Sequence, residues 1–192
     1  MPDHDAIAER GRALEDDYFR KKDLELIEKM RQAAAAEEAR KDLGRKTGLD
    51  DPELIQELSD LGFTPETVGL LPLVPVMQMA WAEGGITKPE RELILRLARS
   101  RGIEPATAAD RQLTEWITIR PAEAVFTGAR RLIRAMLDSG SAQAGDLDAE
   151  GLVEYCEAIA AASGGILGIG RISAEERALL SSIAVDLHAR RS

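Results

Sequence analysis

The chain has 192 residues, of which 44% are hydrophobic and 31% are charged, and its formal net charge is −9 at pH 7. A disordered chain of this length would carry fewer apolar side chains, so the composition excludes disorder throughout and predicts a buried core. The acidic balance argues against nucleic acid and anionic lipid surfaces as main partners, because both attract clustered positive charge.

The number of cysteines and the length of the apolar stretches indicate the cellular compartment of the protein. A single cysteine, Cys156, cannot form an internal disulfide, and two histidines cannot build a His-rich metal site. The first residues are charged and lack the apolar run of a signal peptide. The most apolar stretch, 68–82, is shorter than a bilayer span and contains Pro72 and Pro75. The sequence therefore predicts a cytoplasmic protein with no membrane span.

The N-terminal segment is expected to be a long helical arm. Residues 5–42 contain no proline, mix charges of both signs and end in an alanine-rich stretch, all of which favour helix. Their apolar side chains form only a narrow stripe, so the arm either packs on its own domain along one edge or is free for a partner or a second copy of the chain. We expect a linker over 44–48. The predicted domains are the arm, 1–46, and an all-helical domain, 47–192.

Start and stop signals divide the rest of the chain into short helices. Asp51 before Pro52 is an N-cap followed by proline at the first helical position, and Gly62 ends that helix. The prolines within 65–82 are expected to kink or split a central buried helix. No strand pattern interrupts the series, which predicts an all-α fold. The remaining expected helices cover 89–100, 108–119, 121–137, 149–162 and 174–189.

Two segments of the chain share one pattern, which runs from a small-residue helix end through Gly-Gly and isoleucine to a hydroxyl residue and Glu-Arg. They are WAEGGITKPERELI from Trp81 and ASGGILGIGRISAEERALL from Ala162. The offset is 86 residues from Ile86 and Ile172 onward but 80 at the glycines, so the second segment carries an insertion over 166–171. A period this long predicts two helical halves about a pseudo-twofold axis.

The first segment, read as LVPVMQMAWAEGGITKPERELI, resembles the tellurite-resistance TerB-like domain family and is similar to the N-terminal region of a membrane-anchored DnaJ co-chaperone. The family has an apolar helix ending in Ala-Asp-Gly, a short turn with isoleucine, and a helix opening with Ser/Thr, Pro or Ala, and Glu. Glu83 stands where the family has Asp. The second segment is similar to the C-terminal loop of a bacterial TerB-like subgroup. The resemblance covers 61–187 and leaves the arm unexplained.

Membership of this family implies a compact all-helical bundle with a non-enzymatic role. That role would be protein interaction or a stress response in the bacterial cytoplasm. The family is also associated with metal ions and with membrane-associated complexes, so the resemblance implies a protein partner and leaves a metal-sensing role open.

Two interpretations are open for the glutamates around the repeated turns, Glu83, Glu90 and Glu176. Thr87 with Glu90, and Ser173 with Glu176, fit the capping box, in which the hydroxyl accepts from the N3 amide and the N3 carboxylate accepts from the cap amide. Alternatively the three carboxylates form a weak divalent-cation site, as the family's association with metal ions implies. An EF-hand is excluded, because its first and third positions lack carboxylates. No other cofactor is expected.

The arm has a resemblance of its own. Its segment LEDDYFRKKDLELIEKMR, from Leu14, resembles the inhibitory helix of mitochondrial ATP-synthase inhibitor proteins. If that similarity is functional, the chain regulates an ATP synthase, and Tyr18, Phe19 and Arg20 are the anchors that bind its groove. The alternative is that the two aromatic side chains attach the arm to its own domain.

No catalytic group can be named from the sequence. His4 and His188 lie near the ends of the chain, and Cys156 has no histidine at a usable spacing. The glycine-rich segment 163–170 follows a helix and lacks the Gly-Lys-Ser/Thr of a phosphate-binding loop, which favours a packed crossover. We therefore expect that the protein is not an enzyme.

Overall fold

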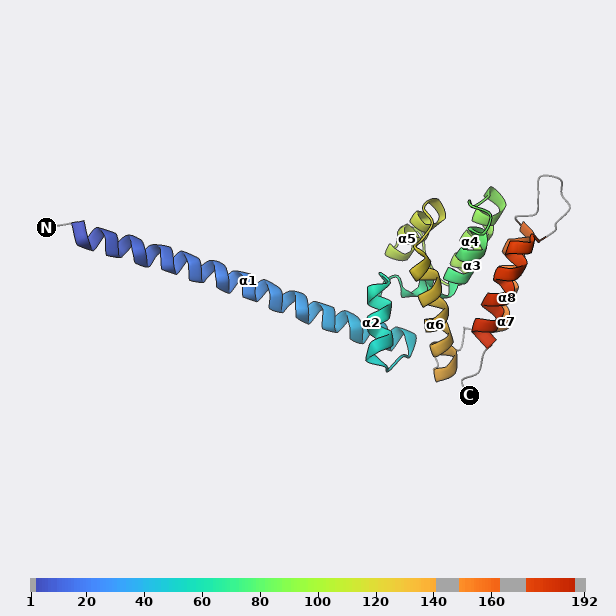
Figure 1. The fold of residues 1–192 in the computed structure, drawn as a ribbon, viewed down its shortest axis with the longest axis horizontal. Coiled ribbons are helices and arrows are strands. Elements are labelled where there is room, and N and C mark those ends of the chain that lie inside the picture. The colour runs from blue at the N-terminus through green and yellow to red at the C-terminus, as the bar shows by residue number, and fades with distance from the viewer. Residues whose placement is uncertain (1–2, 141–148, 163–171, 189–192) are drawn as a thin grey trace. The chain divides into compact units, whose positions relative to one another are not determined.

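The computed structural model describes residues 3–140, 149–162 and 172–188. The chain divides into two compact units, Met1–Ala39 and Arg40–Ser192. The described residues form α-helices, one 3₁₀-helix and no strand, which confirms the all-α prediction (Figure 1). The elements are α1 (Asp3–Thr47), α2 (Pro52–Asp60), η1 (Val68–Leu73), α3 (Val74–Ala80), α4 (Lys88–Ser100), α5 (Ala108–Thr118), α6 (Glu123–Ser139), α7 (Ala149–Ala162) and α8 (Ala174–His188). The glycine-rich segment 163–170 and the insertion 166–171 lie outside the described residues.

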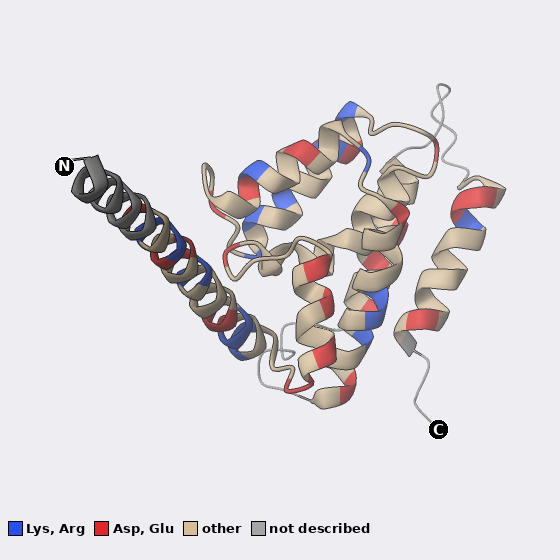
Figure 2. Cartoon of the chain, turned by 60° about the vertical axis from the view of Figure 1, so that its left-hand side comes forward, with Lys and Arg blue, Asp and Glu red and all other residues tan. Residues whose placement is uncertain are grey.

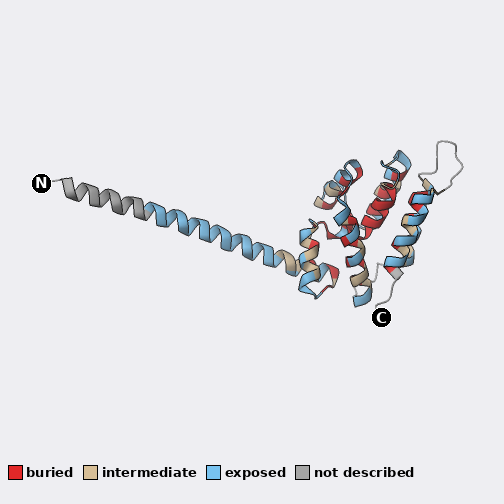
Figure 3. Cartoon of the chain, in the orientation of Figure 1, coloured by how far each residue is buried: buried red, intermediate tan, exposed pale blue. Residues whose placement is uncertain are grey.

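The first unit consists of the larger part of helix α1, and the predicted long helix is confirmed. Every side chain from position 17 to position 38 is exposed (Figure 3). Acidic and basic residues both occur along this surface (Figure 2). Ion pairs link successive turns, from Lys21 to Asp17 at 2.9 Å and from Lys22 to Glu25 at 3.2 Å. Such pairs and the alanines at 33–36 favour helix without burial.

Helix α1 does not end at the expected linker over 44–48. It continues to Thr47, because Leu43 and Thr47 are buried in the second unit and the Thr47 hydroxyl donates a hydrogen bond to the Leu43 carbonyl at 2.8 Å. Gly48, with φ of 69°, then ends the helix, and its N–H bonds to the Gly44 carbonyl at 2.8 Å. Gly44 therefore lies inside the helix and Gly48 ends it, so the predicted linker is wrong.

The prolines split the apolar segment of the second unit, as predicted. Pro72 lies inside η1, and Pro75 lies in the first turn of α3, where a missing N–H costs nothing. All seven residues of α3 are buried (Figure 3). Helix α3 contacts η1, α4, α6, α7 and α8. It is therefore the centre around which the second unit packs.

The outer helices are fixed by caps and by bonds between elements. The Asp51 carboxylate accepts from the Glu53 N–H at 2.9 Å, which confirms the predicted N-cap of α2. The Trp81 indole donates to the Trp116 carbonyl at 2.9 Å, joining the end of α3 to α5. Arg130 of α6 forms an ion pair of 2.8 Å with Asp186 of α8. None of the described helices combines the length and apolar character that crossing a membrane requires.

Truncation of a side chain on α3 tests the central place of this helix. Met77 is fully buried, so Met77→Ala removes its packing and leaves a cavity, and we expect a loss of about 2–5 kcal/mol in the free energy of unfolding. Val185 is 65% exposed, so Val185→Ala should change stability by no more than about 0.5 kcal/mol. Denaturant unfolding measures both, and equal effects would contradict the assignment of α3 to the centre.

Candidate functional site

The first predicted capping box forms at the start of α4. The Thr87 N–H donates to Glu90 Oε2 at 2.7 Å, and the Thr87 hydroxyl donates to the same oxygen at 2.6 Å. In return the Glu90 N–H approaches Thr87 Oγ1 at 3.5 Å. The Thr87 backbone is extended, as an N-cap requires. Glu90 is only 2% exposed, so its carboxylate completes a helix end inside the protein.

The second predicted capping box forms in the same way at the start of α8. The Ser173 N–H donates to Glu176 Oε2 at 2.7 Å, and the Glu176 N–H donates to Ser173 Oγ at 3.1 Å. Glu176 is 1% exposed. Each of the two segments that share a sequence pattern therefore buries one glutamate at the N-terminus of a helix.

Two of the predicted glutamates, Glu83 and Glu176, lie within electrostatic reach of the third, Glu90. Burial raises the pKa of Glu90 above its usual value, and the negative charges of Glu176 and Glu83 act in the same direction. The hydrogen bonds from Thr87 oppose this rise in the pKa. Glu83 is exposed, in the turn between α3 and α4. The fold thus brings together two carboxylates that are 86 residues apart in the sequence, Glu90 and Glu176.

This arrangement stabilises helix ends, and its capacity for a metal ion is limited. One oxygen of Glu90 and one of Glu176 already accept backbone hydrogen bonds. Among the side chains that the structure describes, those of 17–140, 149–162 and 172–187, no group of three or more His, Cys, Asp or Glu is arranged to hold a metal ion. The cation site at Glu83, Glu90 and Glu176 stays a prediction.

The other predicted site residues lie on the exposed surface of α1. Tyr18 is 58% exposed and Phe19 is 61% exposed. Their rings meet edge to face, with centroids 5.8 Å apart, and the Lys22 ammonium lies 5.8 Å from the Tyr18 ring centroid. Arg20 is exposed beside them. These three residues form a small aromatic and cationic surface within the first unit.

Most of the large hydrophobic side chains that the structure shows exposed lie on α1. Of the large hydrophobic side chains that the structure shows exposed, six lie on this helix: Tyr18, Phe19, Leu24, Leu26, Ile27 and Met30. Solvated helices usually carry polar side chains at such positions. Helix α1 therefore offers aromatic and aliphatic groups for contact with another molecule.

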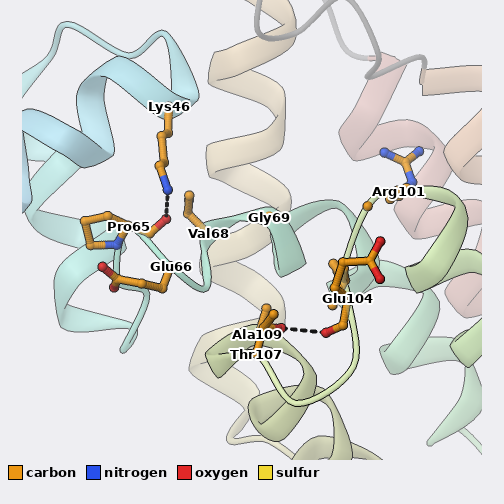
Figure 4. Close-up of a pocket in the computed structure, with 11 residues that line it drawn as sticks. Lys46, Pro65, Glu66, Val68, Gly69, Arg101, Glu104, Thr107 and Ala109 are labelled. Atoms are coloured by element: carbon orange, nitrogen blue, oxygen red, sulfur yellow. Dashed lines mark hydrogen bonds between the residues drawn. The ribbon is translucent and has the colours of Figure 1, made fainter.

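A pocket of about 360 Å³ in the second unit was not predicted from the sequence (Figure 4). Lys46, Glu66, Arg101 and Glu104 line it, so its charges are balanced. The Lys46 ammonium donates to the Pro65 carbonyl at 2.5 Å. In Figure 4 the guanidinium of Arg101 turns away from the other lining residues. The lining comes from three separate segments, and no sequence pattern connects them.

Cys156 has none of the features of a catalytic nucleophile. It is fully buried on α7. Burial, with a smaller contribution from Glu157, raises the pKa of its thiol to about 12. The thiol is therefore protonated at neutral pH, whereas nucleophilic cysteines need a lowered pKa.

Comparisons of the chain with protein-family models, with curated proteins and with solved structures find no match.

The raised pKa of Glu90 predicts a pH-dependent effect of Glu90→Gln. A group whose pKa is higher in the folded state contributes stability at acidic pH and loses that contribution as the pH rises through the folded-state pKa. Glutamine keeps the capping acceptor but does not ionise. The melting temperature of the variant, relative to the parent, should therefore increase between about pH 4 and pH 7.

The matched control is Glu92→Gln, an exposed position on the same helix. Its melting temperature relative to the parent should stay constant over that pH range. A relative melting temperature of Glu90→Gln that falls toward neutral pH would show that the ionised carboxylate stabilises the fold.

Proposed function

We propose that the protein is a non-enzymatic interaction module whose helical arm binds a protein partner. The observation that carries this proposal is the set of exposed apolar side chains on α1, which includes Tyr18 and Phe19. Aromatic and arginine side chains dominate the energetics of protein interfaces, and a helix can bind by placing such anchors in a groove. Arg20, which follows the two aromatic residues in the chain, is exposed and is the third proposed anchor.

We also propose that the second unit is a TerB-like domain built from two related halves. Two features support this. Its two capping boxes make the same pair of hydrogen bonds, and the buried glutamates Glu90 and Glu176 lie within electrostatic reach. The family resemblance then gives a stress-response role in the cytoplasm, with a membrane-associated complex as one class of partner.

Photo-crosslinking tests the arm as the binding surface. A photoreactive amino acid in place of Leu26, which is 56% exposed on α1 and lies two turns from Phe19 on the same side of the helix, should give an adduct of higher mass in cells that express the protein. The double variant Tyr18→Ser, Phe19→Ser should reduce that adduct by about tenfold or more, since interface anchors commonly contribute over 1.4 kcal/mol.

The control places the same photoreactive group at Ile119, which is 63% exposed in the second unit. This position should give no adduct that depends on Tyr18 and Phe19. An adduct at Ile119 with none at Leu26 would assign binding to the second unit and contradict the proposal.

A second candidate function is cation sensing at Glu83, Glu90 and Glu176, favoured by the repulsion that the other two carboxylates exert on Glu90. A cation bound there would relieve this repulsion. Ca²⁺, Mg²⁺, Mn²⁺ or Zn²⁺ added to the chelator-treated protein should then raise its melting temperature. A cation at a hundredfold excess over its Kd should increase the free energy of unfolding by about 2.7 kcal/mol.

The variants Glu90→Gln and Glu176→Gln separate a bound cation from an effect of ionic strength. Each keeps the capping acceptor and removes one charge, so the cation-dependent rise should vanish in both. An unchanged melting temperature of the parent in all four cations would rule out this function and leave capping as the role of Glu90 and Glu176.

A further inference from the structure

The side chains of α1 between positions 19 and 34 differ from one side of the helix to the other. Successive residues of an α-helix turn by about 100°, so side chains three, four, seven or eight positions apart share a side. One side of this segment is apolar and exposed, and between these positions only Asp23 interrupts it. The members of this apolar side are Phe19, Leu26, Ile27, Met30, Ala33 and Ala34.

Basic residues border the apolar side along both of its edges. Lys22 and Lys29 follow one edge, and Arg20 and Arg31 follow the other. All four side chains are exposed. Long basic side chains place their stems along apolar surface while their charged ends extend beyond it. The apolar side and these four residues together form a surface with an apolar centre and two positive edges, which we name the binding face.

The carboxylates next to this segment lie mainly on the opposite side of the helix. Asp17, Glu25 and Glu28 are exposed there, together with Lys21, which pairs with Asp17 at 2.9 Å. The ion pair of 3.2 Å between Lys22 and Glu25 leaves both side chains more than half exposed, so it contributes little and does not hold Lys22 strongly. The positive charge that borders the apolar side is therefore available to another molecule.

We propose that the partner of the arm is a different protein, with an apolar groove whose two rims carry carboxylates. This inference rests on the proposed function, because it names the side of α1 that binds and the chemistry of the groove. From position 19 to position 34 the binding face is about 22 Å long at 1.5 Å per residue, which suits a helix lying in a groove. Phe19 and Met30, at 61% and 64% exposure, fill the apolar floor, and the basic edges face the rims.

An anionic membrane also attracts a helix with an apolar side and basic edges, but two observations favour a protein groove. The formal net charge of −9 repels the chain from anionic lipid. Asp23 lies within the apolar side, and hydrocarbon offers no hydrogen-bond donor to a carboxylate. A protein groove supplies such a donor at one fixed position.

Photo-crosslinking on two sides of α1 tests the binding face in cells that express the full chain. A photoreactive amino acid at Met30 should form an adduct with the partner. The same group at Gln32, which is exposed on the opposite side, should not. Phe19→Ser should reduce the adduct at Met30 by about tenfold, because the groove then loses its aromatic anchor.

Charge reversal tests the rims with a matched pair of variants. Lys29→Glu places a carboxylate at an edge of the binding face, and Lys21→Glu makes the same change on the opposite side. The adduct at Met30 should fall by about threefold or more in Lys29→Glu, since attraction to the rim becomes repulsion, and by less than about twofold in Lys21→Glu. Circular dichroism should show equal helix content in both variants.

Reversal of the partner's charge completes this test. Mass spectrometry of the adduct identifies the partner and the sequence beside its crosslinked position. Replacing the partner carboxylate that faces Lys29 with lysine should restore the adduct of Lys29→Glu, because the pair of opposite charges is then re-formed with its signs exchanged.

Several results would overturn the inference. These are equal adducts at Met30 and Gln32, equal effects of Lys29→Glu and Lys21→Glu, failure of the charge exchange, or an adduct of two copies of this chain. Sedimentation of the parent with vesicles of phosphatidylcholine and phosphatidylglycerol, abolished by Phe19→Ser, would assign the face to a membrane instead. The proposed function survives the first three results if the adduct at Leu26 still depends on Tyr18 and Phe19. The absence of any adduct at Leu26 and at Met30 would reject both.

Discussion

The second unit depends on the burial of α3, a helix with no polar face except Gln78. A seven-residue helix is too short to be stable alone, so its neighbours must hold it. Helices α4, α6, α7 and α8 all contact it, and each places an apolar face toward it. Pro72 and Pro75 stand at the junction of η1 and α3, where they shorten the helix without breaking a bond that its neighbours need.

The same packing explains why two glutamates are buried. Helices α4 and α8 begin inside the second unit, where their first N–H groups would otherwise lack partners. Glu90 and Glu176 complete capping boxes there, at 2% and 1% exposure. Burial raises the pKa of Glu90, with smaller contributions from the negative charges of Glu176 and Glu83, and the hydrogen bonds from Thr87 oppose this rise only in part. The carboxylates are thus first of all structural, and a cation would act on an arrangement that already exists.

Local signals in the sequence predicted much of the fold, because caps and breakers act within a few residues. Asp51, Thr87 and Ser173 each begin a helix as expected. Gly44 and Gly48 misled the prediction, since the burial of Leu43 extends α1 to Thr47 and only tertiary contacts decide that. The pocket beside Lys46 was missed for the same reason: its walls come from distant segments that no local pattern relates.

The helix of the arm is stabilised by other interactions than the helices of the second unit. Its helix is maintained by alanine, by ion pairs one turn apart and by good helix formers, so it needs no core. Aromatic residues add nothing to such a helix, because they lose side-chain freedom against the preceding turn. Tyr18 and Phe19 nevertheless stand exposed between charge runs of opposite sign. Helix formation does not explain these two residues, whereas the proposed binding of a protein partner would.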